Sequence, residues 1–370
     1  MRVLMTADPV GGVWTFALEL CACLARRGVS VALATLGAPL TPVQRSAAAA
    51  VPGLQVEESG FKLEWMPDPW GDLERAAHWL LRLEREHRPD VIHLNHLVHA
   101  DLPWRAPAIV TGHSCVMSWW RAVHGAEAPV QWAAYARRVT RSLQAAECVA
   151  APTRAMLSEL RRLYGPLPLA AVVPNGRDPA RFQQSRRKEP LVLCAGRLWD
   201  AAKNVQALAA AAPLLDWPVY AAGEAVSPDG SRAPIAGGNL RLLGTLTPDE
   251  LAAWYGRAGI YALPARYEPF GLTALEAALS GCALLLGDIS SLREVWGDAA
   301  WYVPPDDHAR LHERLAELIS NGAARTALAT RAARVAARLS PEGTAQGYLR
   351  LYGKLAGKTF RSDTTHAAQA

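Results

Sequence analysis

The stretch MRVLMTADPVGGVWTFALELCACLARRGVSVALATL, residues 1–36, decides the fold. An apolar run at 2–7 is followed by a turn with two glycines, by a helical pattern at 16–28 that a glycine ends, and by a second apolar run at 29–36. A strand, a helix and a strand in this order form a unit whose two strands are parallel. The stretch therefore predicts the beginning of a parallel α/β domain.

The same alternation of short apolar runs and helical patterns continues to about residue 175. Further strands are expected at 90–94, 108–112, 147–151 and 170–174, and helices at about 72–87, 130–146 and 153–164. Together with residues 1–36 they make one doubly wound, Rossmann-like domain.

The segment PNGRDPARFQQSRRKEP, residues 174–190, interrupts this periodicity and is typical of a linker. Buried parallel strands are then expected again at 191–196, 218–223, 240–244, 259–264 and 282–287. We predict an N-terminal Rossmann-like domain at 1–175, a linker at 176–189, a second Rossmann-like domain at 190–340, a last helix at 341–357 and a disordered tail at 358–370. Two such domains face a central cleft beyond the carboxyl ends of their strands, where ligands bind.

Composition limits the class of protein. A chain of 370 residues suits two domains, and its net charge of +5 is spread evenly, which predicts no nucleic-acid partner and is compatible with a weak contact with an anionic membrane surface. The six cysteines lie in apolar segments without zinc-site spacing, and no apolar run reaches the ~18 residues of a membrane span. We expect a cytoplasmic protein with reduced thiols, either free or peripheral to the inner face of the membrane, as a monomer or homodimer.

Two turns after first strands are candidate phosphate sites. Gly11 and Gly12, in DPVGGVW, place backbone N–H groups at the start of a helix, although a plain tight turn explains them equally well. The turn lacks the GxGxxG spacing of a dinucleotide fold, and the second strand ends without an acid for a ribose. In AGRLWDAAKN, Arg197 and Lys203 suit a diphosphate, and the alternative is two unrelated surface cations.

Two glutamates lie in LPARYEPFGLTALEAALSG, residues 263–281. The segment reads as the end of a strand, a turn and a helix closed by Gly281, so Glu268 belongs to the turn and Glu276 lies more than one turn inside the helix. Thr273 and Glu276 also have the spacing of a capping box, in which the acid would only bond to the backbone.

Histidines and tryptophans supply the remaining candidates. His93, His96 and His99 are spaced by three, but the segment crosses a strand end, which argues against a metal site. His113 follows a strand and could face the cleft or be structural. Trp119 and Trp120 could stack on a sugar or a lipid-linked acceptor, or pack in the core.

These segments, taken together, resemble the retaining GT-B glycosyltransferases, especially family four. The resemblance covers nearly the whole chain, and its pieces are GGVW (11–14), TGHS (111–114), VPNGRD (173–178), AGR and the lysine of 195–203, LLGTLTPDEL (242–251), LPARYEPFGLTALEAALSG (263–281) and SLREVWGDAAWYVPPDD (291–307). It implies a GT-B fold with the acceptor on the N-terminal domain and a nucleoside-diphosphate sugar on the C-terminal domain. It also implies that the last helix crosses back to the N-terminal domain.

The resemblance assigns roles to residues. Glu276 would bind the ribose, the segment around Leu246 would meet the base, and Arg197 and Lys203 would grip the diphosphate. Gly12, beside Gly11, would approach the diphosphate from the other domain, and His113 would lie near the reacting sugar. The sugar hydroxyls would be held by Glu268 and by backbone N–H groups near Phe270, Gly271 and Leu272.

The implied reaction moves a hexose to an acceptor with retention, without a metal or a cofactor. The acceptor hydroxyl would attack from the face that the diphosphate leaves, and a phosphate oxygen would take its proton, so neither glutamate needs to be a base, unlike in many glycoside hydrolases. Candidate acceptor residues are Trp14, His96, Trp119 and Trp120, and the acceptor could be a small molecule, a glycan or a lipid-linked sugar.

The sequence also departs from the family pattern and leaves alternatives. RLWDAAKN is about one residue longer than the commoner loop, Asn204 replaces a usual glycine, and Trp14 stands where a smaller or polar residue is usual. A sugar-nucleotide epimerase of the same fold, an NAD-dependent dehydrogenase and a non-catalytic sugar-nucleotide binding protein are the competing hypotheses.

Overall fold

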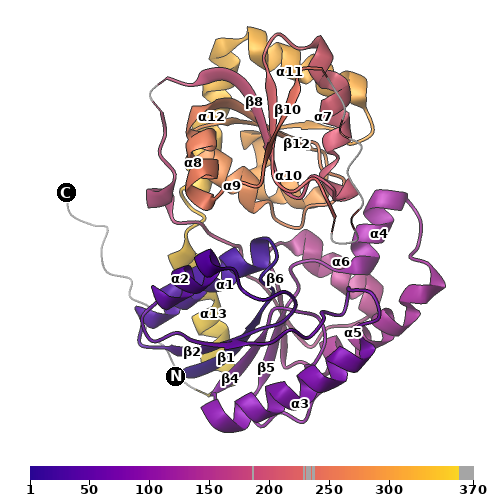
Figure 1. Cartoon of the computed structure of the whole chain (residues 1–370), viewed down its shortest axis with the longest axis vertical. Helices are drawn as coiled ribbons and strands as arrows, with labels where there is room; N and C mark the ends of the chain where they lie inside the picture. Colours follow the sequence, from indigo (N-terminus) through magenta and orange to yellow (C-terminus); the bar gives the residue numbers. More distant parts are fainter. Residues whose placement is uncertain (186, 228–229, 231–234, 236–237, 358–370) are drawn as a thin grey trace.

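The computed structural model describes residues 1–357 except 186, 228–229, 231–234 and 236–237. Two parallel sheets, each covered by helices, lie one above the other along the long axis of the molecule (Figure 1). The lower domain in this view is N-terminal and the upper one is C-terminal. The tail predicted at 358–370 lies outside the described residues.

The N-terminal domain is built on a seven-stranded sheet in the order β3-β2-β1-β4-β5-β6-β7. Its strands are β1 (Arg2–Ala7), β2 (Ser30–Thr35), β3 (Gln55–Glu58), β4 (Val91–Leu94), β5 (Ala108–Thr111), β6 (Cys148–Ala151) and β7 (Leu169–Val172). Its helices are α1 (Gly12–Ala25), α2 (Pro42–Ala49), α3 (Trp70–His87), α4 (Val116–His124), α5 (Ala133–Ala145) and α6 (Arg154–Tyr164). The strand order reverses between β1 and β4, and ligands of open α/β sheets bind beyond the carboxyl ends of the strands at such a point.

The C-terminal domain has, among the described residues, a six-stranded sheet in the order β10-β9-β8-β11-β12-β13. Its strands are β8 (Glu189–Ala195), β9 (Val219–Ala222), β10 (Leu240–Gly244), β11 (Ala258–Leu263), β12 (Ala283–Gly287) and β13 (Trp301–Val303). Its helices are α7 (Val205–Ala211), α8 (Pro248–Arg257), α9 (Leu272–Leu279), α10 (Ser290–Trp296), α11 (His308–Ser320) and α12 (Gly322–Ala336). The order reverses between β8 and β11, which is the second such point.

The predicted fold class is confirmed, because both sheets are parallel and doubly wound. The elements that were not predicted include the helices α2, α4, α10, α11 and α12 and the strands β3 and β13. β3 is an edge strand of four residues, none of them fully buried, and β13 has only three residues. Such short, half-exposed strands lack the continuous apolar run by which buried parallel strands are recognised.

The helix α13 (Pro341–Leu355) follows the C-terminal domain along the chain but packs on the N-terminal domain. Ala345, Tyr348 and Tyr352 belong to the same buried cluster as α1 and the first strands, and Figure 1 shows this helix in yellow in the lower domain. His93 on β4 joins the helix to the sheet, since its Nδ1 lies 2.6 Å from the Tyr352 hydroxyl and its Nε2 lies 2.8 Å from Thr111 Oγ1. Burial lowers the pKa of His93 to about 3.

Replacing His93 with Asn should give a stability penalty that depends on pH. The unfolded chain protonates this histidine near pH ~6.5, whereas the native protein does so only near 3, so native stability is lost as the pH falls between these values. Asn has no such proton, so we expect the penalty of the variant to be about 2 kcal/mol smaller at pH 5 than at pH 7 in urea unfolding. Tyr352→Phe removes the partner but keeps the histidine and should show a penalty with little pH dependence. Equal His93→Asn penalties at both pH values would contradict this account.

Candidate active site between the two domains

The loop that follows β8 brings together the two predicted diphosphate-binding cations. Arg197 Nη2 lies 3.0 Å from Asp200 Oδ2, and Lys203 ends the short 3-10 helix η3 (Ala201–Lys203). Asn204 adopts a left-handed conformation with φ of 55°, which Asn tolerates better than most residues, and its Nδ2 donates to the carbonyl groups of Pro264 and Pro305. Asn204 thus serves at the position where the family pattern has glycine.

Glu268 faces this loop from the end of β11. Lys203 Nζ lies 2.5 Å from Glu268 Oε2, and both side chains are largely buried. The other carboxylate oxygen accepts a hydrogen bond of 3.0 Å from the backbone N–H of Gly271, which has φ of 90° and precedes α9. A non-glycine residue is strained at this φ, so the turn that presents Glu268 depends on Gly271. The structure therefore brings Lys203 and Glu268 into direct contact.

The glycine turn of the N-terminal domain approaches the same place. Gly11 precedes α1 with φ of 81°, and Gly12 is the first residue of that helix. A Cβ added to Gly12 would lie 3.3 Å from Leu272 Cδ1 at the start of α9, so a side chain here would press against the other domain. The starts of α1 and α9 consequently meet across the interface, and both helix N-termini favour a negatively charged ligand.

Asp8 adds a titratable carboxyl group to this part of the interface. Burial raises its pKa to about 6, a nearby Glu64 adds to that rise, and the positive charge of Arg197 opposes it. Asp8 Oδ1 accepts a hydrogen bond from the backbone N–H of Val10. Arg197 is therefore close enough to the first loop of the N-terminal domain to act on its electrostatics.

Glu276 belongs to a buried ion-pair network with the linker. Arg177 Nε lies 2.8 Å from Glu276 Oε1, and Arg177 Nη1 lies 2.5 Å from Glu19 Oε1 on α1. Burial raises the pKa of Glu276 and raises that of Glu19 to about 7, while Arg177 opposes both rises. The capping-box alternative is wrong, because α9 begins at Leu272 without a side-chain cap and Glu276 faces Arg177 instead.

His113 follows the carboxyl end of β5. Its Nε2 is 2.9 Å from Asn95 Oδ1, and its ring packs against Phe16 with centroids 4.6 Å apart. Asn95 Nδ2 donates to the Thr6 carbonyl, so Oδ1 is the oxygen left to accept from the N–H of His113. Burial lowers the pKa of His113 to about 4, so the ring is neutral at pH 7.

Two candidate acceptor residues are corrected. Trp14 is 7% exposed and belongs to the core cluster of the N-terminal domain, so its ring has no face free for a substrate. His96 is also buried and lies between Thr6 Oγ1 and His99 Nδ1, each 2.9 Å away. His99 in turn contacts the Leu73 carbonyl, so this pair forms a satisfied structural network.

The two neighbouring tryptophans of α4 differ in their surroundings. The indole N–H of Trp119 donates a 2.9 Å hydrogen bond to Asp200 Oδ1 in the other domain. The ring of Trp120 packs on His124, with centroids 4.3 Å apart. Trp119 thus contacts the loop of Arg197 and Lys203, and the acceptor role of Trp120 stays a prediction.

The other predicted donor residues lie on the C-terminal domain. The ring of Phe270 is buried in the core of that domain, so only its backbone can meet a ligand. Leu246 is partly buried between β10 and α8, and Leu272 is partly exposed at the interface. The base-binding role of Leu246 stays a prediction.

Direct contacts hold the domains together beside the site. The Tyr267 hydroxyl lies 2.7 Å from Ser118 Oγ, and Thr153 Oγ1 donates to the Pro269 carbonyl. The carboxylate of Glu294 accepts from the backbone N–H groups of Arg154 and Ala155 at the start of α6. The turn that carries Glu268 is therefore fastened to the N-terminal domain on both sides of the glutamate.

Residues of this site were missed at the sequence level. Arg177 was noted only as part of the linker, Asp200 only as part of a lengthened loop, and Tyr267 only as the neighbour of Glu268. Asp200 had one local signal, since it lies three residues after Arg197 and Asp is a preferred N-cap. The contacts of Arg177 and Tyr267 cross between domains, so no local spacing of residues predicts them.

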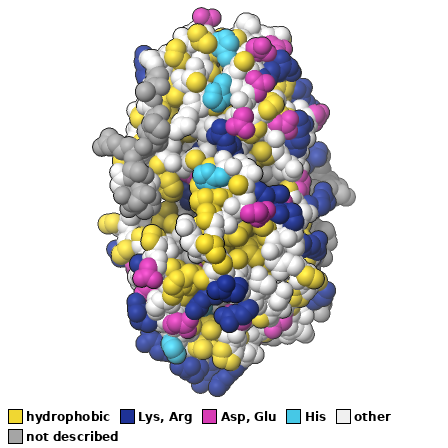
Figure 2. All heavy atoms as spheres, turned by 90° about the vertical axis from the view of Figure 1, so that its right-hand side faces the viewer, with side chains coloured by type: hydrophobic (Ala, Val, Ile, Leu, Met, Phe, Trp, Pro, Cys, Tyr) yellow, Lys and Arg dark blue, Asp and Glu magenta, His cyan; other side chains and the backbone are white. Residues whose placement is uncertain are grey.

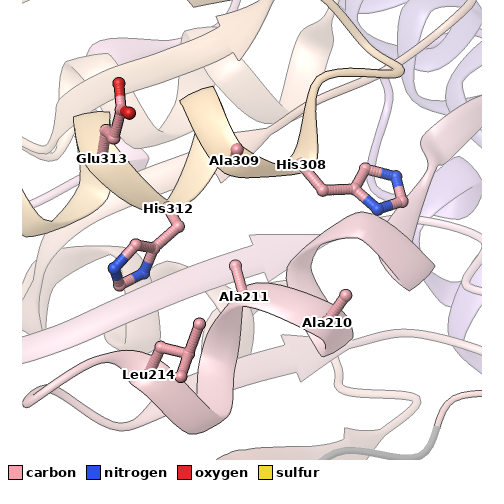
Figure 3. Close-up of a pocket in the computed structure, with 7 residues that line it drawn as sticks. All are labelled: Ala210, Ala211, Leu214, His308, Ala309, His312 and Glu313. Carbon is pink, nitrogen blue, oxygen red and sulfur yellow. The ribbon is translucent and has the colours of Figure 1, made fainter.

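Two surface hollows lie away from this site. One, of about 320 Å³, lies between α7 and α11, where Figure 3 shows His308 and His312 near the α7 side and Glu313 pointing away from it. The other, of about 660 Å³, lies beside the end of α3 and includes three arginines, Arg85, Arg88 and Arg105. Figure 2 shows basic side chains gathered at the N-terminal-domain end of one face. Within the described ranges, no group of three or more His, Cys, Asp or Glu side chains is arranged to hold a metal ion.

Two further features concern the cysteines and the character of the helices. All six cysteines are buried and free. In the part of the chain that the structure describes, none of the helices combines the length and apolar character needed to cross a bilayer.

Comparisons with known proteins place the chain among sugar-transferring enzymes. Residues 10–181 match the family model of Glycosyltransferase Family 4, and residues 189–321 match that of Glycosyl transferases group 1. A glycogen synthase of Mycobacterium tuberculosis is 30% identical over 236 residues, which are 58% of this chain and 56% of that protein, so the likeness spans about half of the relative.

Solved structures share the fold across nearly the whole chain. Sucrose-phosphate synthase from Thermosynechococcus elongatus superimposes with a TM-score of 0.84 at 19% identity, covering 96% of this chain and 99% of that one. The Anabaena protein HepE, in complex with UDP and glucose, gives a TM-score of 0.76 at 16% identity, covering 96% and 100%. At these identities the likeness establishes the two-domain architecture.

Proposed function

The chain belongs to the GT-B glycosyltransferases of family 4 and group 1, and we propose that it moves a hexose from a nucleoside-diphosphate sugar to an acceptor with retention of configuration. The observation that carries the proposal is the contact of Lys203 with Glu268, with Arg197 on the same loop as Lys203 and Gly12 of α1 approaching Leu272 at the start of α9. Cations, a carboxylate and helix N-termini at one interface suit a diphosphate joined to a sugar.

The proposed chemistry depends on charge stabilisation. Cleavage of the bond between the anomeric carbon and the phosphate leaves positive charge on the sugar and negative charge on the diphosphate. Arg197 and Lys203 would neutralise the leaving group, together with the N-terminus of α1 or α9. In this proposal a phosphate oxygen takes the proton of the acceptor hydroxyl as the latter attacks from the same face, and no step requires a metal.

The two glutamates have separate roles in this proposal. Glu268, on the turn beside Lys203, would hold the hydroxyls of the sugar when the diphosphate takes its place beside the lysine. Glu276 would bind the ribose, and its contact with Arg177 orients its carboxylate from the linker. His113 is neutral at pH 7 and would meet the sugar as a hydrogen-bonding group and not as a cation.

The donor is expected to be a UDP-, GDP- or ADP-linked hexose. HepE, which shares the fold, binds UDP and glucose, and this makes UDP-glucose the first probe. Neither the epimerase nor the dehydrogenase hypothesis is favoured by any observation on the site, and the matched families are glycosyltransferases.

A thermal-shift screen of UDP, GDP, ADP and their sugars tests the proposal. We expect one nucleoside diphosphate to stabilise the protein by about 2.7 kcal/mol at one hundred times its dissociation constant, and NAD to have no effect. Release of the diphosphate from the matching sugar nucleotide should follow when an acceptor is supplied. Stabilisation by NAD alone, or conversion of the sugar nucleotide without an acceptor, would overturn the transferase proposal.

A further inference from the structure

Asp200 lies at the centre of the loop that carries both proposed diphosphate-binding cations. Its side chain is 4% exposed, and its two carboxylate oxygens have different partners. Oδ2 lies 3.0 Å from Arg197 Nη2, while Oδ1 accepts a 3.0 Å hydrogen bond from the backbone N–H of Ala202. The backbone carbonyl of Asp200 accepts from the N–H of Lys203 at 2.9 Å. One residue therefore orients the side chain of Arg197 and caps the turn that ends in Lys203.

The N-terminal domain reaches this residue through Trp119. The indole N–H on α4 donates to the same Oδ1 at 2.9 Å, across a separation of 81 residues. Asp200 is buried and charged, so its carboxylate needs these donors, and loss of one leaves an acceptor without its partner. The hydrogen bond forms only where the two domains are in contact.

We propose that Trp119 and Asp200 are positioning residues, through which contact with the N-terminal domain sets Arg197 and Lys203 in the geometry that grips the diphosphate. The inference rests on the proposed function and deepens it. Without the indole N–H, the Asp200 carboxylate keeps the Ala202 N–H and Arg197 but loses its link to the N-terminal domain, so the position of Arg197, which is 41% exposed and lies near Asp8, is held less firmly. The lengthened loop RLWDAAKN supplies the aspartate that accepts the hydrogen bond from the other domain.

The preference for a diphosphate over the matching monophosphate measures this geometry directly. Both nucleotides share the base and ribose contacts, whereas Arg197 and Lys203 act mainly on the terminal phosphate. A change that only destabilises the fold would weaken the binding of both nucleotides to the same extent. We would measure the dissociation constants of UDP and UMP by calorimetry, or of the GDP and GMP or ADP and AMP pair if the thermal-shift screen selects that base.

Trp119→Phe keeps an aromatic ring and removes the N–H, and we expect it to lower the preference for the diphosphate about tenfold, as for loss of a hydrogen bond to a charged group. Trp104→Phe is the matched control, because the Trp104 indole donates a 2.7 Å bond to the His99 carbonyl within the N-terminal domain. This control should leave the preference unchanged. Arg197→Ala should lower the preference at least as much as Trp119→Phe.

Asp200→Ser tests whether the two residues act through one contact. Serine can still cap the 3-10 turn but is too short to hold Arg197 and Trp119 together. We expect the diphosphate preference of the double variant Trp119→Phe/Asp200→Ser to be no lower than that of Asp200→Ser alone, because Asp200→Ser already removes the shared hydrogen bond. Fully additive losses would overturn the proposed coupling.

The outcomes separate this inference from the proposed function. If Arg197→Ala abolishes the diphosphate preference but Trp119→Phe behaves like Trp104→Phe, the positioning role is wrong and the proposed function stands. If Arg197→Ala keeps the full preference, or the native protein shows none, the diphosphate role of Arg197 is wrong, and the inference falls with it.

Discussion

Replacing Arg197 with Ala should slow turnover ~100-fold or more while the fold stays intact. The guanidinium is placed against charge that develops on the leaving diphosphate, and removal of one such donor raises the barrier by about 2.7 to 4 kcal/mol. The side chain is 41% exposed and pairs with Asp200 on its own loop, so its loss should cost little stability. Release of nucleoside diphosphate from the sugar nucleotide, measured at saturating donor, gives the change in kcat.

Three further variants test this result. Arg310→Ala removes an exposed arginine paired with Glu313 on α11 and should keep native turnover. Arg197→Lys keeps the charge without the planar pair of donors and should recover only part of the rate. Glu268→Ala should also lower activity, because it removes the carboxylate beside Lys203. Full activity in both Arg197→Ala and Glu268→Ala, with native melting temperatures, would sink the proposed function.

Arg177→Met should destabilise the protein by about 3 to 5 kcal/mol at pH 8, because it leaves buried carboxylates without their cation. The Arg177 side chain is 6% exposed and lies within 2.8 Å of both Glu19 and Glu276, which come from different domains. Methionine fills a similar volume without charge, so the loss of unfolding free energy comes mainly from the unpaired acids and not from a cavity. Urea unfolding gives the free energy.

The penalty of Arg177→Met should shrink as the pH falls. Burial already holds the folded pKa of Glu19 at about 7, above an unfolded value near ~4.5, and removing the cation raises it further. A group with a raised folded pKa gains stability as the pH falls through that value, so protonation at pH 5.5 relieves the repulsion. Glu19→Gln in the Arg177→Met background should recover part of the loss at pH 8. A penalty below 1 kcal/mol that does not vary with pH would contradict this account.

Local periodicity was sufficient to predict most of the fold. Strands such as β12, ALLLG, are buried on both faces and form continuous apolar runs, and glycine or proline turns separate them from helices. The helix α4 was not predicted, because it follows directly on TGHS and its tryptophans were considered as ligand contacts. Its boundary depends on Cys115, whose sulfur caps the first turn, and this is a weak signal in sequence.

Candidate residues could be named from the sequence, but their contacts could not. Arg197, Lys203, Glu268 and Glu276 were chosen from one turn and one motif, and the structure brings Lys203 into contact with Glu268 while Arg197 pairs with Asp200 on the loop of Lys203. Trp14 and His96 were chosen for their residue type and are buried, because the apolar face of α1 and the end of β4 turn inward. A residue type indicates a ligand contact only when its side chain is accessible in the candidate site.

Apolar runs and glycine turns alternate along the chain in a fixed order, so the amino-acid sequence alone determines two doubly wound domains and the loops that follow their strands. The tertiary structure decides which side chains in those loops meet. Lys203 and Glu268 are 65 residues apart and meet through the fold of the C-terminal domain. Trp119 and Asp200 are 81 residues apart, and Arg177 joins Glu19 to Glu276; these contacts need the two domains to approach in one orientation. No local pattern encodes either kind of contact, so the proposed diphosphate site depends on tertiary packing.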